Sequence, residues 1–198
     1  MRYSELVKCY ERLEATTKKL EKRDILSEFY QHSDDLELVV PLSMGVIFPA
    51  GQMELGVAQE TIRRIIAKTY GVSESEVVRK FKETGDLGLA AEFFASHRKQ
   101  MALARKALTA QHIFENLRKL PEISGKGSQG RKIALVQELL SHASPREARY
   151  IVRTVLGDMR VGVAAGIVRD AIALAFSQEP NAVEHAFNIV GDFSTVAR

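Results

Sequence analysis

Apolar residues recur every three or four positions along most of this 198-residue chain, the spacing that gives an α-helix one buried face. In the run LGVAQETIRRIIAKTY, residues 55–70, Ile62, Ile66 and Tyr70 share a face while Arg64 points away. No sustained alternation of apolar and polar residues predicts a strand. We therefore predict an all-α, multi-helix domain of about ten to twelve helices.

Capping residues predict where several of these helices begin. Ser73 and Ser144 each stand three residues before a Glu, and in that arrangement the two side chains satisfy backbone amides at the helix start. Pro145 then occupies the first helical position, where its missing N–H costs nothing. Three further starts are predicted on similar grounds: Thr109 before residues 110–120, Ser128 before 129–142, and Asp34 with Glu37 before 35–44.

The chain carries an internal repeat. When residues 54–91 are laid on residues 160–197, a shift of 106, eleven of the 38 positions are identical without a gap. Chance at ordinary composition would give about two or three identities. A Gly-Asp pair recurs at residues 85–86 and 191–192, which we interpret as a helix end followed by a turn. We therefore predict two copies of one helical unit, related by an internal pseudo-twofold.

Each copy opens with the same three residues, Gly-Val-Ala, just before a predicted helix. Glycine lets the backbone approach a partner closely, and the first N–H groups of a helix lack an internal acceptor and attract anions. Gly56 with Val57, and Gly162 with Val163, therefore resemble two phosphate sites, one for each backbone of a duplex. Tight helix–helix packing at each glycine is the alternative interpretation.

Residues 124–132, SGKGSQGRK, combine three glycines with three cations ahead of a helical run. Glycine permits close approach, Ser128 offers a cap and a hydroxyl, and Lys126, Arg131 and Lys132 supply positive charge. The spacing and the preceding helix exclude a nucleotide-binding Walker loop. The pattern predicts an anion contact, with a flexible solvated loop as the alternative.

Three arginines surround the second Gly-Val-Ala: Arg153, Arg160 and Arg169. Arg160 stands directly before the turn and is the strongest candidate for a contact to a phosphate backbone. Arg149 and Arg153 lie four residues apart, so they share a helical face. A solvated face is the alternative for this pair.

Composition and charge narrow the class of protein without deciding it. A net charge of +3 and 45% apolar residues are typical of a globular protein with a core. The single cysteine, Cys9, forms no internal disulfide, and the five histidines show no metal-ligand spacing. No apolar run is long enough to span a membrane and no signal peptide opens the chain, so we expect a cytoplasmic location. We expect no catalytic residue, metal site or cofactor in this chain.

Four separated motifs resemble one known family. The run LGDMRVGVAAGIVRDAIALAF, the loop SGKGSQGRK, the turn TGDLG and the opening RYSELVKCYERLEATTKKLEKRDIL together look like the N-terminal DNA-binding domain of archaeal ATP-dependent DNA ligases. The resemblance covers residues 1–198. It implies an all-helical domain that grips nicked duplex DNA largely through the minor groove, with contacts to phosphates and sugars and little reading of bases.

The resemblance assigns candidate DNA contacts to the positions that match these motifs. They are Gly56 and Val57 in the first copy, Arg160, Gly162, Val163 and Arg169 in the second, Gly125, Lys126, Gly127, Ser128, Gln129 and Lys132 in the loop, and Thr17, Lys18 and Arg23 near the N-terminus. Arg131 and Arg153 join this set on charge alone. We expect all of them to serve one DNA-binding surface.

The resemblance also implies chemistry that this sequence does not carry. Such ligases attack ATP with the lysine of a K-x-D-G motif and use ATP and Mg²⁺. No K-x-D-G occurs here, so we expect these 198 residues alone not to seal nicks. Some relatives bind a sliding clamp through a Gln followed by paired aromatics. Because Gln100 is followed by Leu103 and Ala104 at the aromatic positions, we expect weak or absent clamp binding.

Two other functions compete with this interpretation. A helical protein-interaction scaffold would use the glycines for packing alone and would not bind nicked duplex at low salt. A sequence-specific regulator needs a recognition helix rich in Asn, Gln and Arg, whereas residues 164–176 are mostly Ala, Ile and Val. For the ligase domain we expect Gly162→Asp to weaken DNA binding far more than Lys22→Ala.

Overall fold

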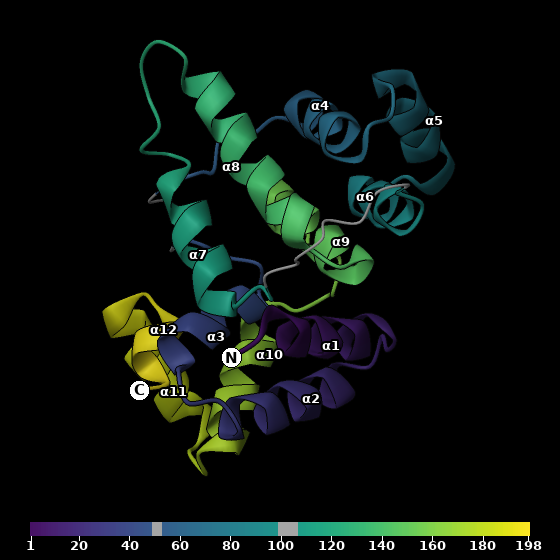
Figure 1. Cartoon of the computed structure of the whole chain (residues 1–198). Helices are drawn as coiled ribbons and strands as arrows, with labels where there is room; N and C mark the ends of the chain where they lie inside the picture. The colour runs from purple at the N-terminus through teal and green to yellow at the C-terminus, as the bar shows by residue number, and fades with distance from the viewer. Residues whose placement is uncertain (49–52, 99–106) are drawn as a thin grey trace.

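The computed structural model describes residues 1–48, 53–98 and 107–198. Across these ranges the chain forms twelve α-helices, and the only β-type pairing is an isolated bridge between Arg2 and Thr109. The prediction of an all-α fold with about ten to twelve helices is confirmed (Figure 1). In chain order the helices are α1 (Tyr3–Glu14), α2 (Lys19–Gln31), α3 (Leu36–Ser43), α4 (Gln59–Tyr70), α5 (Glu74–Thr84), α6 (Leu87–Ser96), α7 (Ala110–Lys119), α8 (Ser128–His142), α9 (Pro145–Leu156), α10 (Ala165–Ala175), α11 (Pro180–Val190) and α12 (Phe193–Val196).

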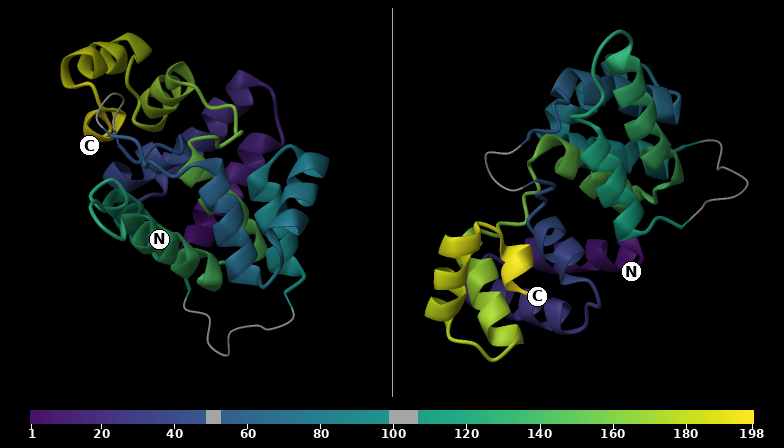
Figure 2. Two further views of the ribbon diagram at one scale, coloured as in Figure 1. Left: turned by 90° about the horizontal axis from the view of Figure 1, so that it is seen from above. Right: turned by 90° about the vertical axis from the view of Figure 1, so that its left-hand side faces the viewer.

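Two groups of helices lie one above the other in Figure 1. The upper group contains α4, α5, α6, α8 and α9, and the lower group contains α1, α2, α3, α10, α11 and α12. The connection from α9 to α10 and the segment leading to α4 both pass between the groups (Figure 2). A single buried apolar core runs through both, so the groups form one body rather than two.

The packing crosses the two copies of the repeat. Helices α4 and α6 of the first copy pack against α8 and α9, which precede the second copy. Helices α10 and α12 of the second copy pack against α2 and α3, which precede the first. The approach of α6 to α9 needs Gly88, since a Cβ there would lie 2.7 Å from the Arg149 carbonyl oxygen. Each copy therefore buries its apolar face against helices from the other part of the chain.

The repeat is visible in the local structure of its elements. Helices α4, α5 and α6 begin at residues 59, 74 and 87, and α10, α11 and α12 begin at 165, 180 and 193, each 106 residues later. Gly85 and Gly191 end the middle helix of each copy with φ of +67° and +76°. Asp86 and Asp192 then accept hydrogen bonds from the first amides of the next helix. The interpretation of Gly-Asp as a helix end and turn is confirmed, while the spatial twofold stays a prediction.

The predicted helix starts are correct to within one residue. Ser73, Thr109 and Ser144 cap α5, α7 and α9 as expected. Asp35, not Asp34, caps α3, with its carboxylate 3.1 Å from the Leu38 amide. Ser128 is not a cap, because Gly127 takes a left-handed φ of +79° and α8 begins at Ser128 itself.

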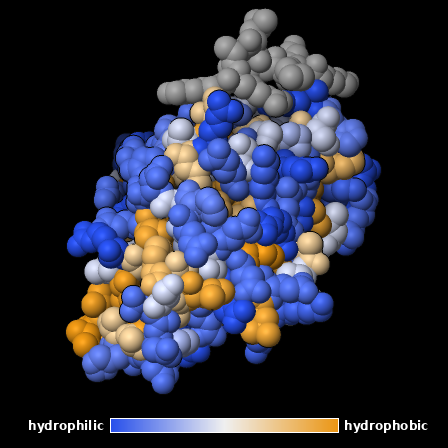
Figure 3. All heavy atoms as spheres, turned by 90° about the horizontal axis from the view of Figure 1, so that it is seen from below, coloured by the Kyte–Doolittle hydropathy of each residue, from blue (hydrophilic) through white to orange (hydrophobic). Residues whose placement is uncertain are grey.

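The surface seen from below is mostly hydrophilic, with apolar atoms gathered toward one edge (Figure 3). The most exposed large apolar side chain is Ile189, at 73%, followed along α11 by Val190. Leu174 and Phe176 at the end of α10 are also exposed. No helix in the described ranges is both long and apolar enough to cross a membrane.

Candidate nucleic-acid interface

The second glycine turn leads into α10 with the first amides of that helix exposed. Gly162 has a φ of +63°, a left-handed conformation that favours glycine, and it is open to solvent. Ala164 at the N-cap supplies no side-chain hydrogen bond, and the following Ala165 and Gly166 are exposed as well. The positive end of the α10 dipole therefore faces solvent with no side-chain acceptor.

The first glycine turn repeats this arrangement at α4. Gly56 has a φ of +62°, and Ala58 at the N-cap again supplies no side-chain hydrogen bond. Gly56, Ala58 and Gln59 are exposed, while Val57 is half-buried and packs against the core. Both Gly-Val-Ala sequences are thus helix entrances, as their positions in the repeat predicted.

A lysine ammonium stands at each glycine turn. A Cβ on Gly56 would lie 3.4 Å from Nζ of Lys132, which comes from α8. A Cβ on Gly162 would lie 2.5 Å from Nζ of Lys22, which comes from α2 and donates a hydrogen bond to the Val161 carbonyl. Any side chain at either glycine would therefore meet both backbone strain and a charged neighbour.

The glycine-and-cation loop is shaped by one of its own arginines. Arg131 donates from Nη2 to the Ser124 carbonyl at 2.7 Å and from Nη1 to the Lys126 carbonyl at 3.1 Å. These bonds draw the loop back over the start of α8, where Gly127 leaves the first amides without a side-chain cap. Arg131 thus fastens the loop, and the exposed Lys126 carries its free charge.

The start of α2 holds the predicted N-terminal contacts. Lys18 is the N-cap and gives α2 no side-chain cap; its ammonium pairs with Glu21 at 2.7 Å. Thr17 beside it is exposed. Arg23, one turn further on, pairs with its neighbour Asp24 at 2.6 Å. The two cations are already partnered at the surface, where such pairs exchange readily for other anions.

Uncapped helix starts coincide with the predicted contacts. Among the described helices, α1, α2, α4, α8, α10 and α11 begin without a side-chain hydrogen bond from the N-cap residue. Four of these six, α2, α4, α8 and α10, carry the predicted contacts at or beside their first turn. The other described helices satisfy at least one early amide internally.

Arg160 lies between the two glycine turns. It lines one small hollow, of about 300 Å³, together with Val57 and Ala58 from the first turn. Its φ of +57° is left-handed, which is uncommon for a residue with a side chain. The guanidinium is 43% exposed and pairs with Asp158 at 2.8 Å and Asp86 at 3.8 Å.

These contacts connect the two glycine turns into one line. We call this series of neighbouring residues, which leads from α8 to α2, the helix-start row. Its members are Lys132, Gly56, Val57, Arg160, Gly162 and Lys22. The row brings together predicted contacts from three parts of the sequence and adds Lys22, which was not among them. Its amides and cations match the needs of a chain of phosphates.

Arg153, a candidate contact because of its charge, lines the same hollow as Arg160 but is almost wholly buried. Its side chain is 3% exposed and pairs with Asp86 at 2.6 Å and Glu14 at 3.0 Å. It also donates to the Met159 carbonyl at 3.3 Å. Burial and two carboxylates occupy the guanidinium, so the structure does not favour a direct contact to DNA, which stays a prediction. Arg153 instead holds the segment that leads to Arg160.

Glu14 connects this buried arginine to α1. Partial burial alone would raise the pKa of Glu14. Hydrogen bonds from Arg153 and Tyr150, with the positive charges of Arg153 and Arg149, outweigh that effect and lower the pKa to about 2. The Tyr150 hydroxyl donates to Glu14 at 2.8 Å, and Arg149 pairs with it at 2.6 Å. The cluster is therefore charged and bonded at neutral pH, and it ties α1, α6 and α9 together.

Arg169 is the remaining predicted cation of the second copy. It lies on α10, 29% exposed, and pairs with Asp170 and Glu184, each at 2.7 Å. The hydrogen bonds that Arg169 donates to these carboxylates, together with their negative charge, outweigh desolvation and raise the pKa of Arg169. Because two carboxylates already neutralise the charge of Arg169, this residue adds little free positive charge near the row.

Lys22 is the row residue that sequence reasoning missed, and we expected Lys22→Ala to weaken DNA binding far less than Gly162→Asp. Its side chain is 6% exposed and touches the Gly162 turn, so Lys22 is not a surface lysine. The only local signal was its place in the first turn of a helix beside Lys18 and Lys19. Its partner Val161 lies 139 residues away, which no spacing rule reaches.

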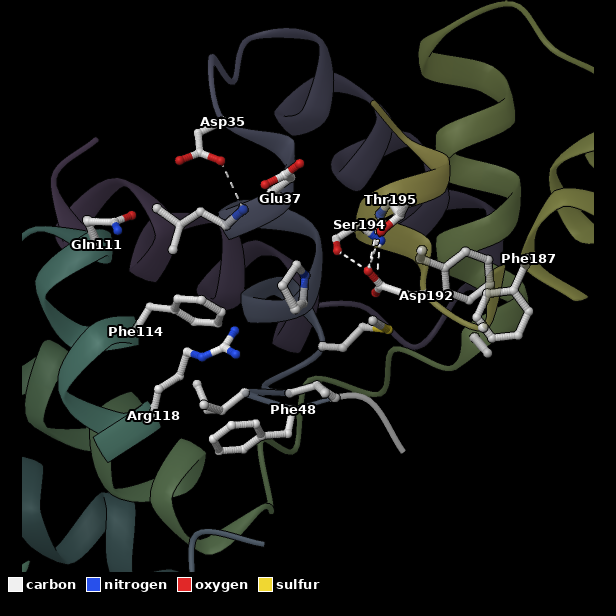
Figure 4. A pocket seen from close by; sticks show the side chains of 18 residues that line it. Asp35, Glu37, Phe48, Gln111, Phe114, Arg118, Phe187, Asp192, Ser194 and Thr195 are labelled. Carbon is white, nitrogen blue, oxygen red and sulfur yellow. Dashed lines mark hydrogen bonds between the residues drawn. The ribbon is translucent and has the colours of Figure 1, made fainter. Parts of the chain in front are cut away.

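A larger hollow lies apart from the row, between α3, α7 and α12 (Figure 4). It has a volume of about 650 Å³, and the Arg118 guanidinium lies 5.1 Å from the Phe48 ring and 5.3 Å from the Phe114 ring. Of its carboxylates, Asp192 bonds to Ser194 and Thr195, and Asp35 caps α3. None of the predicted DNA contacts lines it.

Gln100, Leu103 and Ala104, on which the clamp prediction depends, lie outside the described residues, so it stays a prediction. Within the described ranges, no three His, Cys, Asp or Glu side chains gather in a way that could hold a metal ion.

The fold and the helix-start row together define an all-helical domain in which several uncapped helix starts and cations lie side by side. The family is then given by comparison with known proteins. The model of the family described as "DNA ligase N terminus" matches residues 2–173, and the chain belongs to that family.

Curated relatives agree with this assignment. DNA ligase of Methanothermobacter thermautotrophicus is 44% identical over 199 residues, covering 98% of this chain and 36% of the relative. DNA ligase of Nanoarchaeum equitans is 40% identical over 200 residues, covering 100% and 35%. DNA ligase of Thermococcus onnurineus is 39% identical over 201 residues, covering 100% and 36%. The chain therefore spans about a third of the length of these relatives, and the resemblance to archaeal DNA ligases is confirmed.

Proposed function

We propose that this domain binds nicked duplex DNA with little sequence preference, through contacts to phosphates and sugars. The helix-start row is the observation that carries the proposal. It joins two left-handed glycine turns, each with exposed helix amides and an adjacent lysine, into one line. Backbone amides bind phosphate oxygens without reading bases, so such a row discriminates little between sequences.

The role we propose is positioning. In the full-length ligase, a lysine would take AMP from ATP with release of pyrophosphate and pass the AMP to the 5′-phosphate of the nick. The 3′-hydroxyl would then attack that phosphate and release AMP. ATP and Mg²⁺ enter the proposal only for that full-length enzyme. This domain holds the two sides of the nick in register, and correct alignment of reacting groups lowers the barrier by several kcal/mol, about 7–11 in the most favourable cases. We place the enzyme in the cytoplasm.

A titration of nicked duplex at several salt concentrations tests the proposal. Binding should weaken linearly on a logarithmic plot of affinity against salt, with a slope of about −0.9 for each phosphate contacted. Two duplexes of unrelated sequence should bind within a factor of about three, since phosphate contacts carry no base information. Absence of binding at low salt would favour the protein-interaction scaffold, and a strong sequence preference would favour a regulator.

A further inference from the structure

Lys22 is a buried lysine with no carboxylate partner in the described residues. Its side chain is 6% exposed, and the hydrogen bond that its Nζ makes goes to the Val161 carbonyl. Burial lowers the pKa of Lys22, with Glu14 opposing the shift. An ammonium removed from water without an ion pair costs free energy, so a purely structural position would favour an apolar side chain of the same length.

The Val161 carbonyl and the Gly162 amide belong to the same peptide unit. In a planar trans peptide the C=O and N–H bonds point in opposite directions, and the chain has no cis peptide among its described residues. Because the carbonyl points inward to Lys22, the Gly162 N–H points outward. Gly162 is exposed, and its N–H makes no backbone hydrogen bond in the described structure.

We propose that Lys22 is a positioning residue for the second phosphate site. By holding the Val161 carbonyl, it fixes the peptide so that the Gly162 N–H faces a phosphodiester oxygen of bound DNA. The proposal rests on the DNA-binding function proposed above and names the residue that prepares one of its contacts. Gly162 is needed at the turn because a side chain would displace the Lys22 ammonium.

Lys132 offers an internal contrast. Its Nζ lies 3.4 Å from a Cβ placed on Gly56, farther than the 2.5 Å between Lys22 and Gly162. No hydrogen bond from this Nζ to protein is present in the described structure, and the Lys132 side chain is only half-buried. Lys132 is thus free to meet a phosphate directly. Lys22 and Lys132 therefore differ in a measurable way, since a direct phosphate contact releases a counterion and an indirect role does not.

The experiment compares Lys22→Met, Lys132→Met and the control Lys82→Met, an exposed lysine on α5, in titrations of nicked duplex across salt concentrations. Lys22→Met should weaken binding about tenfold at every salt concentration, leaving the salt slope unchanged. Lys132→Met should reduce the slope by about one, and Lys82→Met should bind like the parent. In the free proteins, the amide resonance of Gly162 should move in Lys22→Met and in neither of the other two.

Each other outcome has a defined meaning. If the parent binds and Lys22→Met binds equally well, the positioning role is wrong. A slope reduced by about one in Lys22→Met would make Lys22 a direct phosphate contact and also overturn it. If the parent itself does not bind, the proposed function fails instead. Should Lys22→Met not fold, Lys22→Gln, which keeps an N–H donor without the charge, takes its place with the same slope criterion.

Discussion

Arg153 on α9 and Asp86 at the start of α6 form an ion pair of 2.6 Å while their side chains are only 3% and 4% exposed. Asp86 also accepts hydrogen bonds from the Gly88 and Leu89 amides, so one carboxylate caps a helix and neutralises a buried arginine. Arg160 reaches the same carboxylate from the surface side, 3.8 Å away. The interior thus connects directly to the row proposed to hold DNA.

Removing this arginine should destabilise the fold strongly. Arg153→Met leaves Asp86 buried without its partner, and breaking a buried pair in this way costs about 3–5 kcal/mol. Denaturant unfolding measures the loss. The control is Arg146→Met, whose pair with Glu11 is exposed and should change stability by less than about 1 kcal/mol. Equal losses in the two variants would contradict the buried network as a stabilising element.

Stability should fall in acid because of Glu14. Its pKa is about 2 in the fold against 4.5 ordinarily, so its stabilising contribution is present above about pH 4.5 and disappears as pH falls toward 2. Urea midpoints between pH 2 and pH 7 measure this dependence. Glu14→Gln should be less stable at pH 7 and should show a flatter profile in that acid range. If Glu14→Gln loses stability with falling pH as steeply as the parent does, a group other than Glu14 is responsible for the acid dependence.

A charge at the second glycine turn should abolish most DNA binding. Gly162→Asp adds strain at a φ of +63°, displaces Lys22 and repels phosphate, so affinity for nicked duplex should fall by about tenfold or more. Gly71→Asp is the matched control, because Gly71 has a φ of +68° at the far end of α4 with open space around it. The same loss in both variants would mean that strain, not the interface, is responsible.

Arg131 should matter for geometry more than for charge. Arg131→Lys keeps the positive charge but loses the paired hydrogen bonds to the Ser124 and Lys126 carbonyls. We expect weaker binding of nicked duplex by a factor of about three to ten, with the salt slope retained. Lys126→Arg should bind like the parent. If Arg131→Lys lowers the slope, Arg131 contacts phosphate itself.

Neither half of the chain should fold alone. The fragment 1–98 lacks α8 and α9, against which α4 and α6 pack, and the fragment 107–198 lacks α2 and α3. Circular dichroism should show little helix and no cooperative melting for each fragment alone. Helix content and cooperative melting should appear when the two fragments are mixed. Cooperative unfolding of one isolated fragment would contradict the crossed packing.

Local features of the fold were predictable from the sequence. The caps at Ser73 and Ser144, the left-handed glycines and the 106-residue repeat depend on near neighbours or on self-comparison. The one-residue error at Ser128 arose because Gly127 adopts a left-handed conformation that favours glycine, which let α8 start one residue early. Such boundaries depend on a single backbone angle.

Long-range contacts were beyond the same reasoning. Arg153 and Asp86 are 67 residues apart, and Lys22 and Val161 are 139 apart. Whether an arginine or lysine faces solvent is decided by which helix packs over it, and spacing along one helix does not contain that information. For this reason one predicted surface contact is interior, and one lysine assumed to be incidental lies in the row.

The crossed packing sets how far apart the two glycine turns stand. Each turn opens a helix whose apolar side packs against helices from the opposite part of the sequence, and both helices contribute to one continuous buried core. The distance between the two turns is consequently set by the packed core. Any double-stranded ligand that engages both must itself bend, widen or narrow to match it.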